Sequence, residues 1–264
     1  MKRLSLLIGI ILLVPPSSST LQAQNNVARI IGGSEARPGQ FPSAAAIYAT
    51  KEDGTYFCVG ALANPQHVLT AAHCVISTIN CQVILGSTTL QGSDPNRLVL
   101  STNYRSIHPY YNPETLENDI ALLMFHLPIT LTDYIQPINL PTERDELFAN
   151  TETVAIGWGQ ISDDTAGLTN HLNYVTVSTI SNAECQISFG DVIVNNMVCA
   201  VGNYNEGACI GDSGGPLIAE INNTQYVVGV SSFISTRGCE TTDPTGYTRT
   251  SPYYSWIVMN LDTA

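Results

Sequence analysis

Apolar and polar positions alternate over short stretches of the chain, and turn-forming residues separate these stretches. Short runs rich in β-branched and aromatic residues, bounded by glycine, proline or asparagine, are typical of β-strands. Such runs recur along most of the sequence, at residues 44–48, 82–85, 97–100, 154–156, 173–178 and 226–233. Many short strands with few intervening helical patterns predict an all-β fold made of antiparallel barrels or a sandwich.

A single helix is predicted, over about residues 251–262 at the end of the chain. Ser251 is a suitable N-cap residue and Pro252 suits the first helical position. The apolar residues that follow fall on one face, namely Tyr253, Trp256, Ile257 and Leu261. We therefore expect a helix that packs on the barrels and closes the fold.

The chain has 264 residues, 44% hydrophobic and 12% charged, which is a globular composition. A chain of this length buries enough apolar surface to need no metal ion for its core. A pause in the strand pattern near residues 130–141 predicts a link between two halves. We expect one barrel over about 30–135 and a second over about 136–250.

The N-terminus has the features of a secretory signal peptide. Lys2 and Arg3 precede an apolar run over residues 4–14, which is too short to span a bilayer. Ala23 is a suitable cleavage residue, so residues 1–23 are expected to be removed and 24–29 to form a propeptide. An uncleaved membrane anchor is the weaker alternative. The remaining chain is expected to be soluble and extracellular.

Charge limits the kinds of partner. The chain carries 10 basic and 22 acidic residues, a net charge of −12. Residues 1–29 hold three of the basic residues and no acid, so the remainder is more acidic still. Such acidity argues against nucleic acid and against anionic membranes as partners. We expect a monomer.

In an oxidising compartment, cysteines are expected to form disulfides rather than to bind a metal ion. The chain has seven cysteines: Cys58, Cys74, Cys81, Cys185, Cys199, Cys209 and Cys239. No CxxC pair occurs, which argues against a zinc site. An odd number leaves one cysteine as a free thiol or in a bridge between molecules.

Three segments carry the residue types of nucleophilic catalysis. They are Thr-Ala-Ala-His-Cys at 70–74, Asn-Asp-Ile-Ala-Leu-Leu at 118–123 and Gly-Asp-Ser-Gly-Gly-Pro at 211–216. A serine hydroxyl needs a base to become a nucleophile, and histidine exchanges protons near neutral pH. A carboxylate behind the histidine fixes its tautomer and stabilises the imidazolium. His73, Asp119 and Ser213 are therefore the candidate catalytic residues.

These three segments, in this order and separation, resemble those of the chymotrypsin family of serine endopeptidases. The similarity extends from Ile30 to nearly the end of the chain, and arthropod digestive and collagenolytic enzymes are among the similar members. The alternative is the nucleophile elbow of α/β-hydrolases, which also contains Gly-x-Ser-x-Gly. Those enzymes have the order serine, acid, histidine, whereas this chain has histidine, aspartate, serine.

The resemblance implies two six-stranded antiparallel β-barrels with the triad in the cleft between them. It places the oxyanion hole at the backbone N–H groups of Gly211 and Ser213. It also implies the disulfide pairs Cys58–Cys74, Cys185–Cys199 and Cys209–Cys239. Cys81 then remains, and we expect it to be a buried free thiol.

The resemblance also implies activation by cleavage. The segment Arg-Ile-Ile-Gly-Gly at 29–33 is similar to the family's activation junction. Cleavage after Arg29 frees the amino group of Ile30, which in the family pairs with the aspartate before the nucleophile, here Asp212. The implied partners are protein or peptide substrates, an activating trypsin-like protease and protein inhibitors of proteases. The implied compartment is a digestive lumen.

The specificity pocket departs from that of trypsin. The family places an aspartate for Lys or Arg recognition six residues before the nucleophile, where this chain has Gly207. The pocket walls map to Ser232, Phe233 and Ile234 and to Thr245. The branched side chains at 234 and 245 imply an elastase-like pocket that accepts small or medium aliphatic residues. The alternative is broad chymotrypsin-like or collagenolytic specificity.

No cofactor and no metal is expected. The loop over residues 86–96 lacks the paired glutamates that bind calcium in some relatives. Asn222 begins one N-glycosylation sequon, Asn-Asn-Thr. The competing functional class is an inactive homologue that acts as a binding or regulatory protein. Retention of all three triad residues, with Gly211 and Asp212, argues against it.

Overall fold

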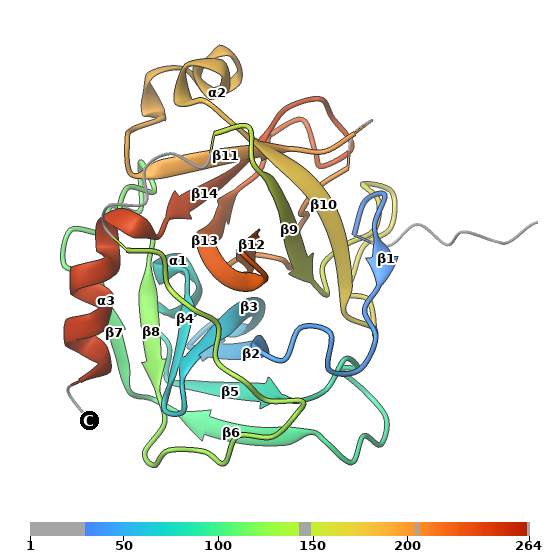
Figure 1. The fold of residues 1–264 in the computed structure, drawn as a ribbon, viewed down its shortest axis with the longest axis vertical. Coiled ribbons are helices and arrows are strands. Elements are labelled where there is room, and N and C mark those ends of the chain that lie inside the picture. The colour runs from blue at the N-terminus through green and yellow to red at the C-terminus, as the bar shows by residue number, and fades with distance from the viewer. Residues whose placement is uncertain (1–29, 143–148, 204–205, 263–264) are drawn as a thin grey trace, which may run out of the picture.

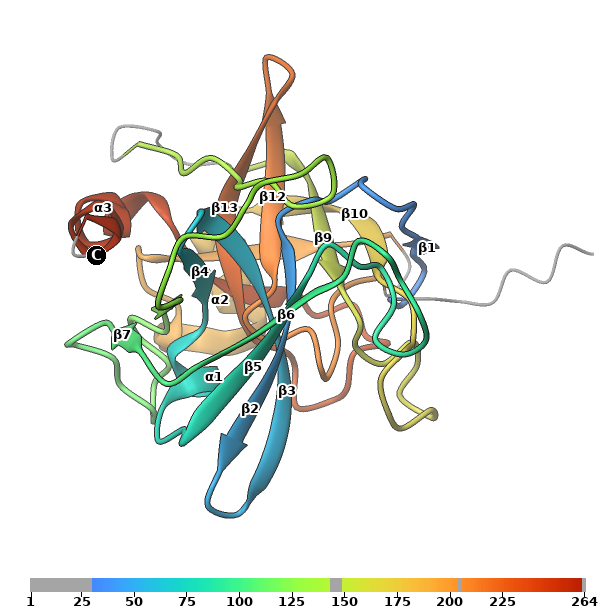
Figure 2. The same cartoon turned by 90° about the horizontal axis from the view of Figure 1, so that it is seen from below.

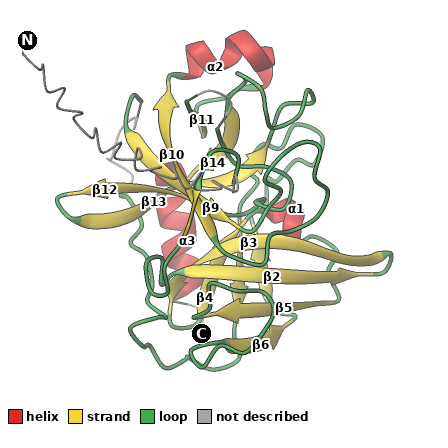
Figure 3. Ribbon diagram, turned by 90° about the vertical axis from the view of Figure 1, so that its right-hand side faces the viewer, coloured by secondary structure: helices red, strands yellow, loops and turns green. Residues whose placement is uncertain are grey.

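The computed structural model describes residues 30–142, 149–203, 206–262, and it shows two antiparallel β-sheets packed together (Figure 1). The predicted signal peptide, the propeptide and Arg29 lie outside the described residues. Strands dominate and the few helices lie at the periphery (Figure 3). The predicted fold class, two antiparallel β-barrels with a C-terminal helix, is confirmed.

The first sheet is curled and has the strand order β6-β5-β2-β3-β4-β8-β7. Its strands are β2 (Ala44–Lys51), β3 (Gly54–Asn64), β4 (His67–Thr70), β5 (Asn80–Leu85), β6 (Leu98–Thr102), β7 (Arg105–Ile107) and β8 (Ala121–Met124). Strands β2 and β3 form a long hairpin that projects from this sheet (Figure 2). His73 lies shortly after β4, and Asp119 lies shortly before β8. These two strands are neighbours in the sheet.

The second sheet closes into a barrel because β9 pairs with both β12 and β10. Its order is β1-β10-β11-β14-β13-β12-β9. The strands are β1 (Ser34–Glu35), β9 (Glu152–Gly157), β10 (Asn173–Ile180), β11 (Met197–Val201), β12 (Pro216–Ile221), β13 (Thr224–Phe233) and β14 (Thr245–Arg249). Ser213 lies three residues before β12, and its carbonyl accepts the N–H of Val59 in β3 of the first sheet.

Strand β10 shows why the alternating pattern predicts this barrel. Val175 and Val177 are buried in the second hydrophobic core, whereas Thr176 and Ser178 are exposed. A period of two places alternate side chains on opposite faces of the sheet, so one face is apolar. Strands β12 and β13 are joined by the two-residue turn Asn222–Asn223, both with positive φ, as such tight hairpins require.

The terminal segments each pack on the opposite barrel. Strand β1 pairs with β10 of the second sheet. The last helix, α3 (Tyr254–Leu261), packs its buried Ile257 into the core cluster of the first sheet. The helix differs from the prediction at its start: residues Ser251–Tyr253 form a 3₁₀ turn, η2, and Thr250 rather than Ser251 occupies its N-cap position, without a side-chain capping hydrogen bond. Proline in this first turn favours the tighter geometry.

Two further helices are α1 (Ala72–Val75), close to β3, and α2 (Asn182–Phe189), which packs on β11 at the outer end of the second barrel (Figure 1). Helix α1 is a single turn that carries His73. Helix α2 was not predicted, although Ser181 and Glu184 form a capping box at its start. It is followed by the 3₁₀ turn η1 (Gly190–Val192). In the described part of the chain, none of the helices is both long and apolar enough to cross a bilayer.

The three predicted disulfides are confirmed: Cys58–Cys74, Cys185–Cys199 and Cys209–Cys239. Cys81 is a free thiol on β5 and is completely buried, as expected. Burial raises the pKa of this thiol, so it is held in the unreactive protonated form.

Candidate active site

The carboxylate of Asp119 is the buried centre of the candidate active site. The residue is 0% exposed and lies between Asn118, which has a φ of 56°, and β8. One oxygen, Oδ1, accepts the backbone N–H of His73 at 2.9 Å. The other, Oδ2, lies 2.7 Å from His73 Nδ1 and accepts the Ser232 hydroxyl at 2.6 Å. Three donors therefore compensate the buried charge.

This arrangement determines the tautomer of His73. An ionised carboxylate only accepts hydrogen bonds, so Nδ1 must carry the proton that it shares with Asp119. The neutral imidazole then has its free lone pair on Nε2, the atom that a general base requires. The His73 side chain is 27% exposed.

Two contacts hold the His73 backbone. The disulfide Cys58–Cys74 anchors the adjacent residue to β3. Lys51, at the end of β2, donates from Nζ to the His73 carbonyl at 3.2 Å and lies over the ring of Tyr56. Lys51 was not among the residues predicted from the sequence. Its signal was compositional, since it is the single lysine in the chain from residue 30 onward.

Backbone hydrogen bonds position Ser213, and one of them comes from the residue next to the same disulfide. The Ser213 carbonyl accepts the N–H of Val59 at 2.8 Å, and Val59 follows Cys58 directly. On the other side, the N–H of Gly214 donates to the carbonyl of Ser231 at 2.8 Å. Across the described residues, the Ser213 hydroxyl forms no hydrogen bond, and His73 Nε2 lies 3.6 Å from Cys74 Sγ.

The loop before Ser213 leaves amide groups available. Gly211 has a φ of +99°, and a Cβ there would lie 2.6 Å from the Leu168 side chain, so only glycine fits. In the described part of the chain, neither Gly211 nor Ser213 donates its backbone N–H to a carbonyl. These are the two amides that the sequence analysis assigned to an oxyanion hole.

Asp212 lies beneath this loop and is 1% exposed. Its carboxylate accepts the backbone N–H groups of Gly159 at 2.7 Å and Cys209 at 2.9 Å. Burial raises its pKa to about 6, although the two hydrogen bonds act in the opposite direction. Ile30 is fully buried in the second hydrophobic core, and Ile31 forms a β-bridge with Gly207.

The predicted pocket residues have different neighbours in the structure, and two of them, Gly207 and Thr245, lie close together. A Cβ on Gly207 would lie 3.3 Å from Thr245 Oγ1, so these two positions face each other. Phe233 packs its ring against Gly246, where a Cβ would lie 2.1 Å from the ring. Ser232, predicted as a wall residue, has a different contact, because its hydroxyl binds the Asp119 carboxylate.

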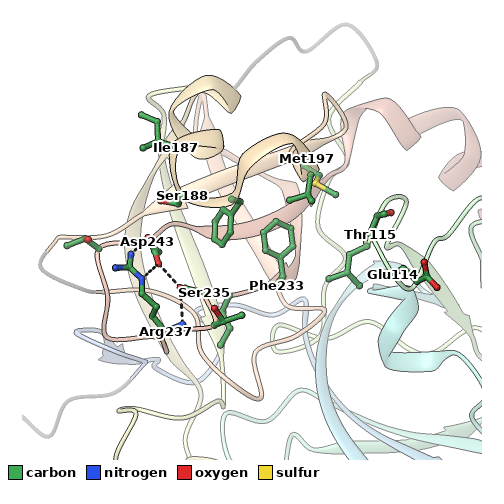
Figure 4. Close-up of a pocket in the computed structure, with 15 residues that line it drawn as sticks. Glu114, Thr115, Ile187, Ser188, Met197, Phe233, Ser235, Arg237 and Asp243 are labelled. Carbon is green, nitrogen blue, oxygen red and sulfur yellow. Dashed lines mark hydrogen bonds and ion pairs between the residues drawn. The ribbon is translucent and has the colours of Figure 1, made fainter.

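A cavity of about 750 Å³ includes Phe233 and Ile234 among its lining residues. It lies between helix α2, the segment before Asp119 and the loop over residues 235–243 (Figure 4). Arg237 closes one end by a bidentate ion pair with Asp243, with Nε 2.8 Å from Oδ2. The Arg237 guanidinium, with the Ser235 hydroxyl, lowers the pKa of Asp243 to about 2. The sequence analysis did not identify this cavity.

The comparisons with known proteins agree with this geometry. The trypsin family model matches residues 30–257. The chain belongs to the trypsin family. Brachyurin from Leptuca pugilator is 33% identical over 86% of this chain and 96% of its own length. Chymotrypsin-like elastase family member 1 from Canis lupus familiaris is 35% identical over 93% and 97%.

A solved structure gives the same assignment for this trypsin-family chain. The structure of HL collagenase superposes with a TM-score of 0.80 and 34% identity, covering 89% of this chain and all of that one. The protein is therefore a serine endopeptidase of the trypsin family, and proteins with elastase and collagenase names are among its relatives.

Proposed function

We propose that the chain is the precursor of a secreted serine endopeptidase that uses His73, Asp119 and Ser213 as its catalytic triad. The observation that carries the proposal is the buried Asp119 carboxylate bound to His73 Nδ1 at 2.7 Å. Cys74, next to His73, forms a disulfide with Cys58. The residue after Cys58 is Val59, and its N–H donates to the Ser213 carbonyl. The compartment follows from residues 1–23, which have signal-peptide features.

In the proposed reaction, His73 Nε2 takes the proton of the Ser213 hydroxyl as Oγ attacks the carbonyl carbon of the scissile bond. The N–H groups of Gly211 and Ser213 donate to the negative oxygen of the tetrahedral intermediate. The imidazolium returns its proton to the leaving amine, and an acyl-enzyme remains. Water then attacks by the same steps and frees Ser213. Asp119 stays ionised and stabilises the imidazolium.

The precursor becomes active when a trypsin-like protease cleaves after Arg29. The freed ammonium of Ile30 pairs with Asp212 and holds the loop of Gly211 in register. The raised pKa of Asp212 supports this step, because a buried carboxylate with a penalty for ionisation gains from a cationic partner. The burial of Ile30 next to the β-bridge between Ile31 and Gly207 supports it as well.

Cleavage after small or medium aliphatic residues is the specificity that the pocket supports best. Gly207 carries no charge for a basic side chain, and Thr245 faces it. Ile234 adds a branched side chain at the wall. One methylene in an apolar pocket discriminates by about 1–3 kcal/mol, so the preference is graded. Relatives named brachyurin and collagenase favour the second candidate, a broad chymotrypsin-like specificity.

The test begins with limited tryptic activation of the precursor. An organophosphonate is expected to label Ser213 in the cleaved protein and to leave the uncleaved protein and the Ser213→Ala variant unlabelled. Arg29→Gln is expected to stay inactive after the same treatment. An unlabelled cleaved protein would support the inactive homologue instead.

The pocket is then tested with peptides that differ only in the residue before the scissile bond. We expect the highest kcat/KM for Ala, Val and Leu. Ile234→Gly with Thr245→Gly is expected to move the preference towards Phe and Tyr. A preference for Phe or Tyr in the unaltered enzyme contradicts the elastase-like assignment and supports the broad one.

A further inference from the structure

The loop between β5 and β6 is organised around the guanidinium of Arg97. Nη1 donates to the carbonyl of Gly92 at 2.7 Å. Nη2 donates to the carbonyl of Thr89 at 2.5 Å, to its hydroxyl at 3.0 Å and to the Ser87 hydroxyl at 3.3 Å. One cation is thus surrounded by four neutral oxygens from the loop that precedes it.

The loop is closed at both ends around this cation. A Cβ on Gly86 would lie 2.2 Å from the Asn96 carbonyl, so the two ends of the loop touch. The Asp94 carboxylate accepts the Ser87 hydroxyl at 2.7 Å and the Asn96 N–H at 3.0 Å. A ring of loop oxygens around one positive charge is also how a protein holds a hard metal ion. Here the charge belongs to the chain itself.

The same loop contacts the second barrel (Figure 2). The Thr88 carbonyl accepts the indole N–H of Trp158 at 3.1 Å and the N–H of Leu172 at 2.6 Å. Leu90 donates its N–H to the Asn170 carbonyl at 2.8 Å. The position of Thr88, between Ser87 and Thr89, therefore depends on the two residues that Arg97 binds.

Trp158 leads directly into the segment that holds the candidate oxyanion loop. Gly159 donates its N–H to Asp212 Oδ1 at 2.7 Å. Gln160 donates its N–H to the Ile210 carbonyl at 2.8 Å. These two hydrogen bonds flank Gly211 on both sides. A shift of residues 158–160 thus moves the amide that is assigned to the oxyanion.

We propose that Arg97 is a positioning residue: its guanidinium closes the loop in place of a metal ion, and the closed loop holds Trp158 and the Gly211 amide in register. The effect on catalysis rests on the proposed function, whereas the effect on the loop does not. The inference adds a residue outside the triad and the specificity pocket to those on which turnover depends.

Arg97→Met removes the donors and keeps most of the apolar stem, and Arg97→Lys keeps the charge. Arg105→Met is the matched control, since Arg105 is a partly exposed arginine of the same barrel with a hydrogen bond to the Asn103 carbonyl at 3.2 Å. For Arg97→Met we expect kcat to fall about tenfold with KM changed less than about twofold, as for a misplaced transition-state donor. Arg97→Lys is expected to recover most of kcat, and Arg105→Met to behave as the unaltered enzyme.

Hydrogen exchange at the indole N–H groups of the two tryptophans separates this effect from a general loss of stability. In Arg97→Met the Trp158 N–H is expected to exchange faster with solvent, while that of Trp256 is unchanged. We also expect Tm to fall by about 5 °C. Calcium and a chelator are each expected to leave the Tm of the unaltered protein within error, because the loop already contains its cation.

A calcium-dependent Tm of the unaltered protein overturns the internal-cation role. An unchanged Trp158 signal in Arg97→Met, or a loss carried by KM alone, overturns the positioning role. If the cleaved protein is not labelled at Ser213, the proposed function fails, and the Trp158 signal and the Tm values alone decide the role of Arg97. If Arg97→Met does not fold, Arg97→Lys and the calcium titration decide it.

Discussion

The buried carboxylate of Asp212 predicts a measurable difference between the precursor and the cleaved protein. In the uncleaved chain, burial raises the Asp212 pKa from 3.8 to about 6. An unfolded aspartate titrates near 3.9. The folded precursor therefore binds this proton more tightly than the unfolded chain does. Its free energy of unfolding must fall as the pH rises from about 4 to about 6, and it stays at the lower value above that range.

The size of the fall follows from the shift. About two pKa units correspond to about 3 kcal/mol, since one unit is worth about 1.4 kcal/mol. This is a sizeable part of the 5–15 kcal/mol, in round terms, that stabilises a typical domain. In the proposed activation, cleavage after Arg29 supplies the ammonium of Ile30 as a partner. The pair favours the ionised carboxylate, lowers its pKa and removes the fall.

The assay is urea unfolding at a series of pH values, with the disulfides intact. Both proteins carry Ser213→Ala to prevent self-digestion, and the uncleaved one also carries Arg29→Gln. We expect the two curves to diverge by about 3 kcal/mol between pH 4 and pH 6.5, since groups that have the same environment in both proteins cancel in the difference. Asp212→Asn in the uncleaved protein is the control and should lose the slope. Identical pH slopes for both proteins would refute the pairing.

Three further predictions follow from individual contacts. Ser232→Ala removes a hydrogen-bond donor that lies 2.6 Å from the Asp119 carboxylate. On a peptide substrate we expect kcat to fall about tenfold with little change in KM. A loss confined to KM would contradict a role of Ser232 in supporting Asp119. Tyr253→Phe removes the hydroxyl that donates to Asn118 Oδ1 at 2.8 Å and accepts from Asn196. We expect the free energy of unfolding in urea to fall by about 1–2 kcal/mol. Unchanged stability would show that other partners replace these hydrogen bonds. Thiol titration should find one reactive group, Cys81, in the denatured protein and none in the native protein; a native reaction would mean that β5 opens.

Local features of the sequence were sufficient for the strands, whereas the cysteine pairs came from the family resemblance, because six cysteines allow many pairings. The alternation around Val175 and Val177 is a property of neighbouring residues, and so is the turn at Asn222–Asn223. The glycine-rich segment around Ser213 is equally local, and it predicts Ser213 as the nucleophile. Helix α2 was missed although its capping box, Ser181 with Glu184, is equally local. Its apolar residues show no clear periodicity, because it buries only Cys185.

Contacts between distant residues could not be predicted in this way. Ser232 and Asp119 are 113 positions apart, and Tyr253 and Asn118 are 135 apart. No spacing rule connects such pairs, because they meet only when β13 and the 3₁₀ turn η2 pack against the first barrel. The large cavity beside Phe233 has the same origin, since three separate segments enclose it.

The amino-acid sequence by itself determined which chemical groups are present and on which faces of the strands they lie, because both depend on residue type and on a period of two. Tertiary structure alone decided which groups are buried together. It removed water from Asp119 and supplied three donors, whereas it removed water from Asp212 and supplied two. Two aspartates of identical chemistry thus acquire different environments, since desolvation and hydrogen bonding are properties of the assembled barrels.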